Sequence, residues 1–371
     1  MTVATSMVNR KVLRDLVQTP QPTVSLYLAL RPDTPTLDTS EDLDLRWRAI
    51  ADDLLAQGAP LDALEALARR LETLPTDPIE VALFASNDGL LLQHEMPGGV
   101  TVDQARYAAP ARIAPLLAWL QQHPAHVVVV ADRTGAEVTE VGPGQVDGHI
   151  ETVVGPDDEI ERNAPGGLAQ PRYQRRAEDS WRHNAGAVAH VARRALRHAS
   201  ADLLLIAGDV RAVQLIEGRL REQLNSHVSV CHLPGGRQPD GSVLARQAAI
   251  ADQVSAHADR TTAAILDHFD AERGPRGRAV EGIAQTLAAL AAGRVETLIV
   301  VDDPHDDRRA WFGPDILCVD DPSQTGRPVA GLRDGRLVDV AVRAALLTDG
   351  DVRVLDRGGP AEGIGALCRF H

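Results

Sequence analysis

The chain has 371 residues, of which 44% are hydrophobic and 24% are charged, and its formal net charge is −14. This length suits two or three domains, and the composition is that of a folded globular protein rather than a disordered one. The negative net charge argues against a protein that coats nucleic acid without specificity, although a local basic patch can still bind phosphates.

The cysteines and the apolar runs point to the cytoplasm. Cys231, Cys318 and Cys368 are far apart and form no CxxC pair, so neither a disulfide framework nor a cysteine zinc site is indicated. The N-terminus lacks the apolar core of a signal peptide, and no run approaches the roughly 18 apolar residues that span a bilayer. We therefore expect a cytoplasmic protein without a membrane partner.

Residues 1–122 are predicted to form a mixed α/β N-terminal domain. Capping residues and apolar periods near 3.6 indicate helices, and alternating or β-branched runs indicate strands. The turn at Asn87-Asp88-Gly89 predicts a hairpin, because Asn and Gly tolerate a positive φ. In chain order we expect a helix, a strand, two helices and a hairpin, at residues 8–17, 24–30, 34–60, 61–74 and 79–97.

Residues 123–238 are predicted to form a central α/β domain. The stretch HVVVVADRTGAEV predicts a hairpin, and the order of elements after it favours an α/β layer. A helix, a strand and a helix follow at residues 173–198, 201–210 and 213–224. The Gly- and Pro-rich stretch 232–242 reads as a linker.

Residues 239–371 are predicted to form a third domain, again α/β, which makes the fold class α/β throughout. Residues 301–336 include an irregular acidic segment, and GGPAEGIG reads as a turn before a last strand. We expect helices and strands at residues 243–271 (helix), 279–292 (helix), 295–303 (strand), 337–350 (helix) and 351–356 (strand).

The segment 172–199 contains seven arginines and two acidic residues, inside a chain of charge −14. Small and apolar residues recur there at helical spacing and form a stripe that can pack on a sheet: Trp181, Ala185, Val188, Ala192, Ala195 and Ala199. Arg175, Arg182, Arg193 and Arg197 then lie nearer the exposed side. Guanidinium groups suit phosphate oxygens, so this helix is a candidate RNA-binding element. The alternative is a solvated arginine face paired with the protein's own carboxylates.

The loop before this helix, GGLAQPRYQRR, resembles the central-domain loop of the archaeo-eukaryotic release factor (Pelota-like) superfamily. In release factors the motif runs Gly-Gly-Gln, three residues, Arg and an aromatic residue. Gly166, Gly167, Arg172 and Tyr173 match it, while Leu168 stands in place of the glutamine. The stretch HVVVVADRTGAEV resembles the hairpin that opens that domain. The likeness is greatest to the bacterial branch, which includes the ribosome hibernation factor Balon.

The C-terminal part carries a second portion of this resemblance. AVEGIAQTLAALAAGRVETLIVVDD and GIGALCRF look like the beginning and end of the superfamily's C-terminal domain, which is similar to ribosomal proteins that bind kinked RNA. The resemblance thus runs from about residue 123 to the end of the chain, and the first 122 residues match less clearly.

The resemblance implies a ribosome-binding protein that has lost hydrolysis. In release factors the glutamine helps to place the water that attacks peptidyl-tRNA, and a leucine has neither a donor nor an acceptor. We therefore expect that the protein is not an enzyme and that it has no catalytic residue and no cofactor. The protein would occupy the A site of idle ribosomes as a stress-response hibernation factor. The expected rRNA contacts are Gly166, Gly167, Leu168, Ala169, Gln170, Arg172, Tyr173, Arg175, Arg176 and Arg182.

The resemblance also implies partners: the rRNA of both ribosomal subunits, elongation factor Tu, and the decoding region for the N-terminal domain. The N-terminal part is acidic on balance, which is unfavourable for contact with RNA. No GxxxxGK[ST] motif occurs, so any GTPase would be a partner. DNA is not an expected ligand.

Two alternative functions remain open on the sequence. A peptidyl-tRNA hydrolase would use Gln170, which requires a rethreaded loop. A Pelota-like rescue factor would recruit a splitting partner to stalled ribosomes.

A cluster of acidic residues after a predicted strand could bind a divalent ion: Asp302, Asp303, His305, Asp306 and Asp307. Adjacent acids after a strand are typical of a solvated loop, so we expect no metal.

Overall fold

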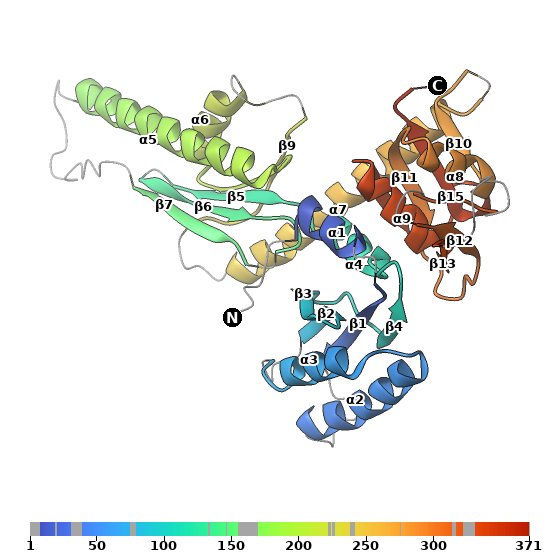
Figure 1. Ribbon diagram of the computed structural model, residues 1–371. Helices are drawn as coiled ribbons and strands as arrows, with labels where there is room; N and C mark the ends of the chain where they lie inside the picture. Colours follow the sequence, from blue (N-terminus) through green and yellow to red (C-terminus); the bar gives the residue numbers. More distant parts are fainter. Residues whose placement is uncertain are drawn as a thin grey trace. The chain divides into compact units, whose positions relative to one another are not determined.

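The computed structural model describes residues 8–18, 21–30, 39–74, 79–132, 134–145, 147–154, 170–221, 224, 227–237, 242–274, 276–313, 317–321 and 331–370. The chain forms two compact units, Met1–Gln121 together with Thr262–His371, and Gln122–Thr261. Both combine helices and sheets, so the predicted α/β class is confirmed (Figure 1). The division into three domains and the likeness of the third to ribosomal proteins stay predictions.

The N-terminal part of the first unit has an antiparallel four-stranded sheet in the order β3-β2-β1-β4. Its strands are β1 (Thr23–Leu30), β2 (Ile79–Ser86), β3 (Gly89–Glu95) and β4 (Gln104–Ala108). Its helices are α1 (Arg10–Gln18), α2 (Thr39–Ala56), α3 (Leu61–Leu71) and α4 (Ala114–Gln122). One face of the sheet packs on α2 and α3 through a buried cluster that includes Leu26, Leu54 and Leu67.

The C-terminal part of the same unit has a mixed sheet in the order β10-β15-β11-β14 and a separate hairpin of β12 and β13. The sheet comprises β10 (Ala279–Glu281), β11 (Val295–Val301), β14 (Asp351–Leu355) and β15 (Ile364–Cys368), with only the β11–β14 pair parallel. The hairpin strands are β12 (Arg309–Phe312) and β13 (Arg333–Arg336). The helical elements are α8 (Ile283–Ala291), α9 (Leu337–Leu347) and the 3₁₀ turn η2 (Ala361–Gly363).

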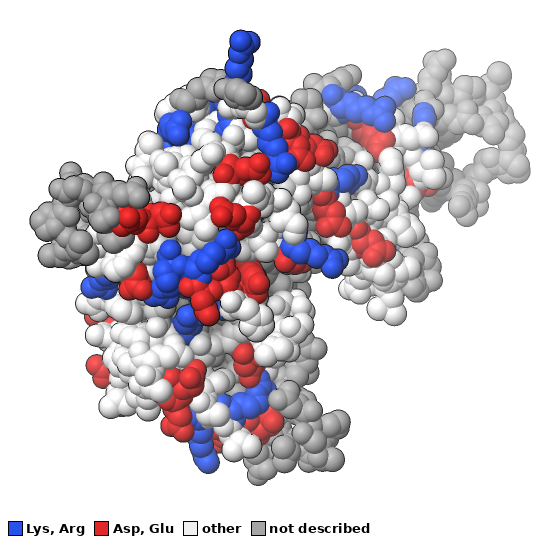
Figure 2. All heavy atoms as spheres, turned by 90° about the vertical axis from the view of Figure 1, so that its right-hand side faces the viewer, with Lys and Arg blue, Asp and Glu red and all other residues white. Residues whose placement is uncertain are grey.

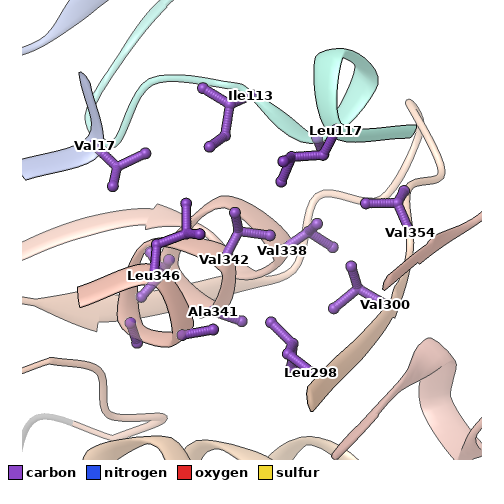
Figure 3. Close-up of a cluster of buried hydrophobic side chains, with 14 of the residues drawn as sticks. Val17, Ile113, Leu117, Leu298, Val300, Val338, Ala341, Val342, Leu346 and Val354 are labelled. Carbon is purple, nitrogen blue, oxygen red and sulfur yellow. The ribbon is translucent and has the colours of Figure 1, made fainter. Parts of the chain in front are cut away.

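A single hydrophobic core joins these two parts of the chain. Figure 3 shows Val17 of α1, Ile113 and Leu117 facing Val342 and Leu346 of α9, and all five side chains are buried. Removing so much apolar surface from water strongly favours the packed arrangement. The first 121 residues and the last 110 therefore fold as one unit although the sequence separates them.

Helix α1 is held on the end of α9 by two arginines. Arg14 donates to the carbonyl oxygen of Leu347 at 2.8 Å and forms an ion pair with Asp349 at 2.8 Å. Arg10 donates to the carbonyl oxygen of Gly350 at 3.3 Å and pairs with Asp351. Cations are favourable at a helix C-terminus, where carbonyl groups lack helical partners.

The second unit contains a five-stranded sheet in the order β7-β6-β5-β8-β9. Its strands are β5 (His126–Ala131), β6 (Gly135–Val141), β7 (His149–Val154), β8 (Leu203–Gly208) and β9 (Ser229–His232). Strands β5, β8 and β9 are parallel, and β6 and β7 run antiparallel to their neighbours. Helices α5 (Gln170–Ala199) and α6 (Val210–Arg221) cover one face. The part of α7 (Ser242–Ala271) up to Thr261 packs on the other face (Figure 1).

The sequence misassigned a few segments. Residues 279–292 were predicted as one helix, but they form β10, a turn at Gly282 with φ of 82°, and α8, because β10 pairs with β15. The segment predicted as irregular contains β12 and β13. Four further elements of the structure have no counterpart among the predicted ones: β4, α4, β7 and β9.

Candidate nucleic-acid interface

The hairpin that opens the second unit is fixed by Asp132 at its turn. The Asp132 carboxylate accepts hydrogen bonds from the backbone N–H of Thr134 at 2.7 Å and of Gly135 at 3.0 Å, and from the Thr134 hydroxyl at 2.7 Å. Arg237 lies 3.2 Å from the same carboxylate. Partial burial opposes ionisation, but the Thr134 hydrogen bonds and the Arg237 charge prevail and lower the pKa of Asp132.

Helix α5 is amphipathic, and its small residues face the sheet. As predicted, Ala185, Val188, Ala192 and Ala195 are buried. They pack with Val129, Val138 and Ile206 of three strands in one cluster. Alanine at this spacing lets the helix backbone approach the sheet closely while its other face stays in water.

The charged residues of α5 divide between exposed and partly covered positions. Arg182 and Arg197 are exposed, as are His183 and His190. Arg193 is half-buried rather than exposed, which differs from the prediction. The described part of the helix thus presents arginines and histidines to solvent on the face opposite the sheet.

Acidic residues of the sheet neutralise part of the C-terminal half of α5. Arg194 pairs with Glu151 of β7, and the Nδ1 atom of His198 lies 2.5 Å from a carboxylate oxygen of Glu140 of β6. The alternative prediction, in which arginines of this helix pair with the protein's own carboxylates, is therefore correct for Arg194. Arg197 forms no ion pair with any residue in the described ranges.

The predicted loop lies outside the described residues, since Gly166, Gly167, Leu168 and Ala169 fall in the gap before α5. Gln170, Arg172, Tyr173, Arg175 and Arg176 belong to the first turns of α5, but their side chains lie outside the description, as does that of Trp181. Arg182 is the one predicted contact whose side chain the structure describes, and it is exposed.

The acidic segment after β11 is not a plain solvated loop. Asp302 is one-tenth exposed and lies between two guanidinium groups, at 3.3 Å from Arg112 and 2.6 Å from Arg336. Asp306 pairs with Arg308 at 2.7 Å. Across the described ranges, no group of three or more His, Cys, Asp or Glu side chains has an arrangement suited to a metal ion.

Two broader observations bear on the type of partner. On the face viewed in Figure 2, Lys and Arg side chains alternate with Asp and Glu, without a large region of one sign. Within the ranges that the structure describes, no helix has the length and apolar character to cross a bilayer. The exposed side of α5 is therefore the candidate surface for binding a polyanion.

A comparison with known protein families finds a match to the part of the chain that contains α5. The family model for bacterial archaeo-eukaryotic release factor family 2 matches residues 125–275, which include the hairpin, α5 and the five-stranded sheet. An uncharacterized protein of Mycobacterium tuberculosis is 27% identical over 379 aligned positions, covering 96% of both chains.

Solved structures of release-factor relatives align along nearly the whole chain. A ribosome-bound archaeal Pelota covers 99% of this chain and 95% of its own, at 11% identity and a TM-score of 0.41. The S. cerevisiae translation termination-like factor Dom34 covers 98% and 92%, at 10% identity and a TM-score of 0.38. At these scores the superpositions carry no argument about function. Over residues 125–275, the chain is similar to bacterial archaeo-eukaryotic release factor family 2.

Proposed function

We propose that this protein binds the ribosome, occupies the A site through its second unit and reaches the peptidyl transferase centre without hydrolysing peptidyl-tRNA. The observation that carries the proposal is the position of basic side chains on α5. This helix packs its neutral side on the sheet and exposes Arg182 and Arg197. It lies in the part of the chain that the release-factor family model matches. Arginine forks suit the dense phosphates of rRNA.

The absence of hydrolysis follows from the residue at the glutamine position. Leu168 can neither donate nor accept a hydrogen bond, so it cannot orient water. Gln170 is the first residue of α5 and thus belongs to the helix rather than to the preceding loop, which disfavours the hydrolase alternative. A protein of this kind would keep an idle ribosome intact and closed to tRNA, as a hibernation factor does.

The descriptions of two of the aligned structures name the partners of those proteins. The archaeal Pelota structure is described as ribosome-bound together with ABCE1, and Dom34 is described as interacting with Hbs1. The resemblance of the segment GGLAQPRYQRR extends the proposal to elongation factor Tu as a GTPase partner and to action in the cytoplasm under stress.

The test is sedimentation of the purified protein with vacant ribosomes, with and without tRNA in the A site. We expect co-sedimentation that A-site tRNA abolishes. The double variant Arg182→Gln/Arg197→Gln should bind about tenfold more weakly, because it loses two charged contacts to phosphate. The matched control is the double variant Arg48→Gln/Arg69→Gln, which removes two exposed arginines from α2 and α3 of the other unit. Binding that tolerates A-site tRNA, or equal loss in both variants, would refute the proposal.

A further inference from the structure

A separate pocket of about 450 Å³ lies in the first unit, remote in sequence from α5. Its wall combines the edge strand β4, Gln57 after α2, and the β12–β13 hairpin. Pockets of about 300–1,000 Å³ are the size that holds small ligands. The charged residues that line it are Arg106, Arg309, Arg336 and Asp334, so guanidinium groups dominate.

Two of these arginines are fixed in place before any ligand binds. Arg336 is 4% exposed and donates to Asp302 at 2.6 Å and to the carbonyl oxygen of Asp306 at 3.2 Å. Arg309 donates twice to one carboxylate oxygen of Asp334, at 3.0 and 2.7 Å. Pre-organised cations bind an anion without losing much side-chain entropy.

Arg106 differs from both, because it is half-buried and forms no hydrogen bond or ion pair with any described residue. The charge of Asp339 acts on Arg106, but a partly buried guanidinium group without a hydrogen-bonded acceptor is costly, and a bound anion would lower that cost. Arg106 is therefore the residue of the pocket that is ready to accept a ligand.

The backbone of β4 adds one neutral donor to the wall of the pocket, the N–H of Ala105. The N–H of Tyr107 points away from β1 and donates to Oε1 of Gln57 at 2.8 Å. Because outward-facing groups alternate along an antiparallel edge, the N–H and C=O of Ala105 also face outward, toward the pocket that Ala105 lines. Gly335 allows the opposite wall to approach, since a Cβ there would lie 2.9 Å from the carbonyl oxygen of Ala109.

The charge balance around the pocket is positive. Arg106, Arg112, Arg309 and Arg336 lie near the carboxyl groups of Asp302 and Asp334. The carboxyl group of Asp339 is buried, and burial raises its pKa to about 7, so it is partly neutral at physiological pH. The field therefore favours an anion.

We propose that this pocket binds the phosphate group of a small ligand of nucleotide size, with Arg106 as its principal contact. The ligand is a phosphate monoester, either a free nucleotide or the phosphorylated end of a short RNA. This site is independent of the proposed ribosome contact, since none of its residues belongs to the second unit.

The test is calorimetric titration of the full-length protein at constant ionic strength with GMP, inorganic pyrophosphate and guanosine. We expect GMP and pyrophosphate to bind and guanosine not to bind. Arg106→Gln should weaken GMP binding about tenfold, as expected for the loss of one charged hydrogen bond. Arg69→Gln is the control, because it removes an equal charge from an exposed position of the same unit.

A 5′-phosphorylated trinucleotide RNA distinguishes the two sources of the phosphate. Tighter binding than that of GMP would assign the pocket to an RNA end, and weaker binding would assign it to a free nucleotide. Equal binding of guanosine and GMP, no binding of either phosphate compound at about 1 mM, or unchanged affinity in Arg106→Gln would overturn the proposal. Arg309→Gln provides a second variant should Arg106→Gln fail to fold.

Discussion

Arg194 of α5 is ion-paired with Glu151 of β7, so the sheet beneath the basic helix removes one of the positive charges that the sequence assigns to it. The pair is about half exposed, with side-chain exposures of 53% and 38%, and exposed pairs contribute little to stability. Its main consequence is electrostatic, because Arg194 is occupied before any phosphate arrives.

Glu151→Gln should therefore strengthen the binding of RNA. We expect a severalfold lower dissociation constant for ribosomes at low salt, and a log–log salt dependence steeper by about 0.7 to 0.9 as one more phosphate is neutralised. The measurement is a salt titration of binding. Glu65→Gln, an exposed acid on α3, controls for the change in net charge. An unchanged salt slope would mean that Arg194 does not reach phosphate even when released.

Leu168→Gln tests whether only the glutamine is missing from the loop. If the surrounding Gly166, Gly167 and Arg172 still match the release-factor pattern, restoring the side chain that orients water should give measurable peptide release. The assay follows release of labelled peptide from ribosomes carrying peptidyl-tRNA. We expect none from the wild-type protein and no effect of Gln170→Ala. Release by the wild-type protein that Gln170→Ala abolishes would instead establish the hydrolase.

Leu346→Ala tests whether the first and last parts of the chain share one core. Leu346 is 4% exposed in the cluster with Val17 and Ile113, and such a truncation costs about 2–5 kcal/mol (Figure 3). Hydrogen exchange should show α4 and α9 losing protection together while β5 and β8 keep theirs. Leu61→Ala, at a position 64% exposed, should change little. Loss of protection confined to the C-terminal part would show that the two parts unfold separately.

The sequence predicted the elements whose signals are local. The α5 helix was predicted from residue 173 to 198 and spans Gln170–Ala199, because its stripe of small residues repeats at the helical period over many turns. Strand β7 was missed because it is short and lies between Gly-rich segments that read as loop. Residues 279–281 form a strand only because they pair with β15, which lies more than 80 positions away.

The same distinction applies to the candidate site. The excess of arginines on α5 is visible in the sequence, but the acidic partners of Arg194 and His198 are not. Glu151 and Glu140 reach the helix only through the register of β7 and β6. The buried position of Asp302 likewise depends on Arg112, which is 190 residues away in sequence. Ion pairs between residues that are distant in sequence form only through tertiary packing, so the local sequence contains no pattern that predicts them.

A last prediction concerns Asp339 in the first turn of α9, which is 3% exposed. Its nearest cation is Arg336, at 3.8 Å, and Asp302 is already paired with that arginine. Burial raises the pKa of Asp339 to about 7, although Arg336 and Arg112 oppose the shift. An unfolded aspartate ionises near pH 4, so between about pH 4 and 7 the folded chain holds a proton that the unfolded chain has lost.

The contribution of Asp339 to the free energy of unfolding is therefore greatest below pH 4 and falls as the pH rises to about 7. Asp339→Asn removes this decrease, because the amide cannot ionise. Relative to the wild type, the variant should gain up to about 4 kcal/mol between pH 4 and pH 8. Urea denaturation across this range measures the difference, and the exposed Asp62→Asn should show no such trend. A constant difference between Asp339→Asn and the wild type would mean that Asp339 ionises as readily in the folded chain as in the unfolded one.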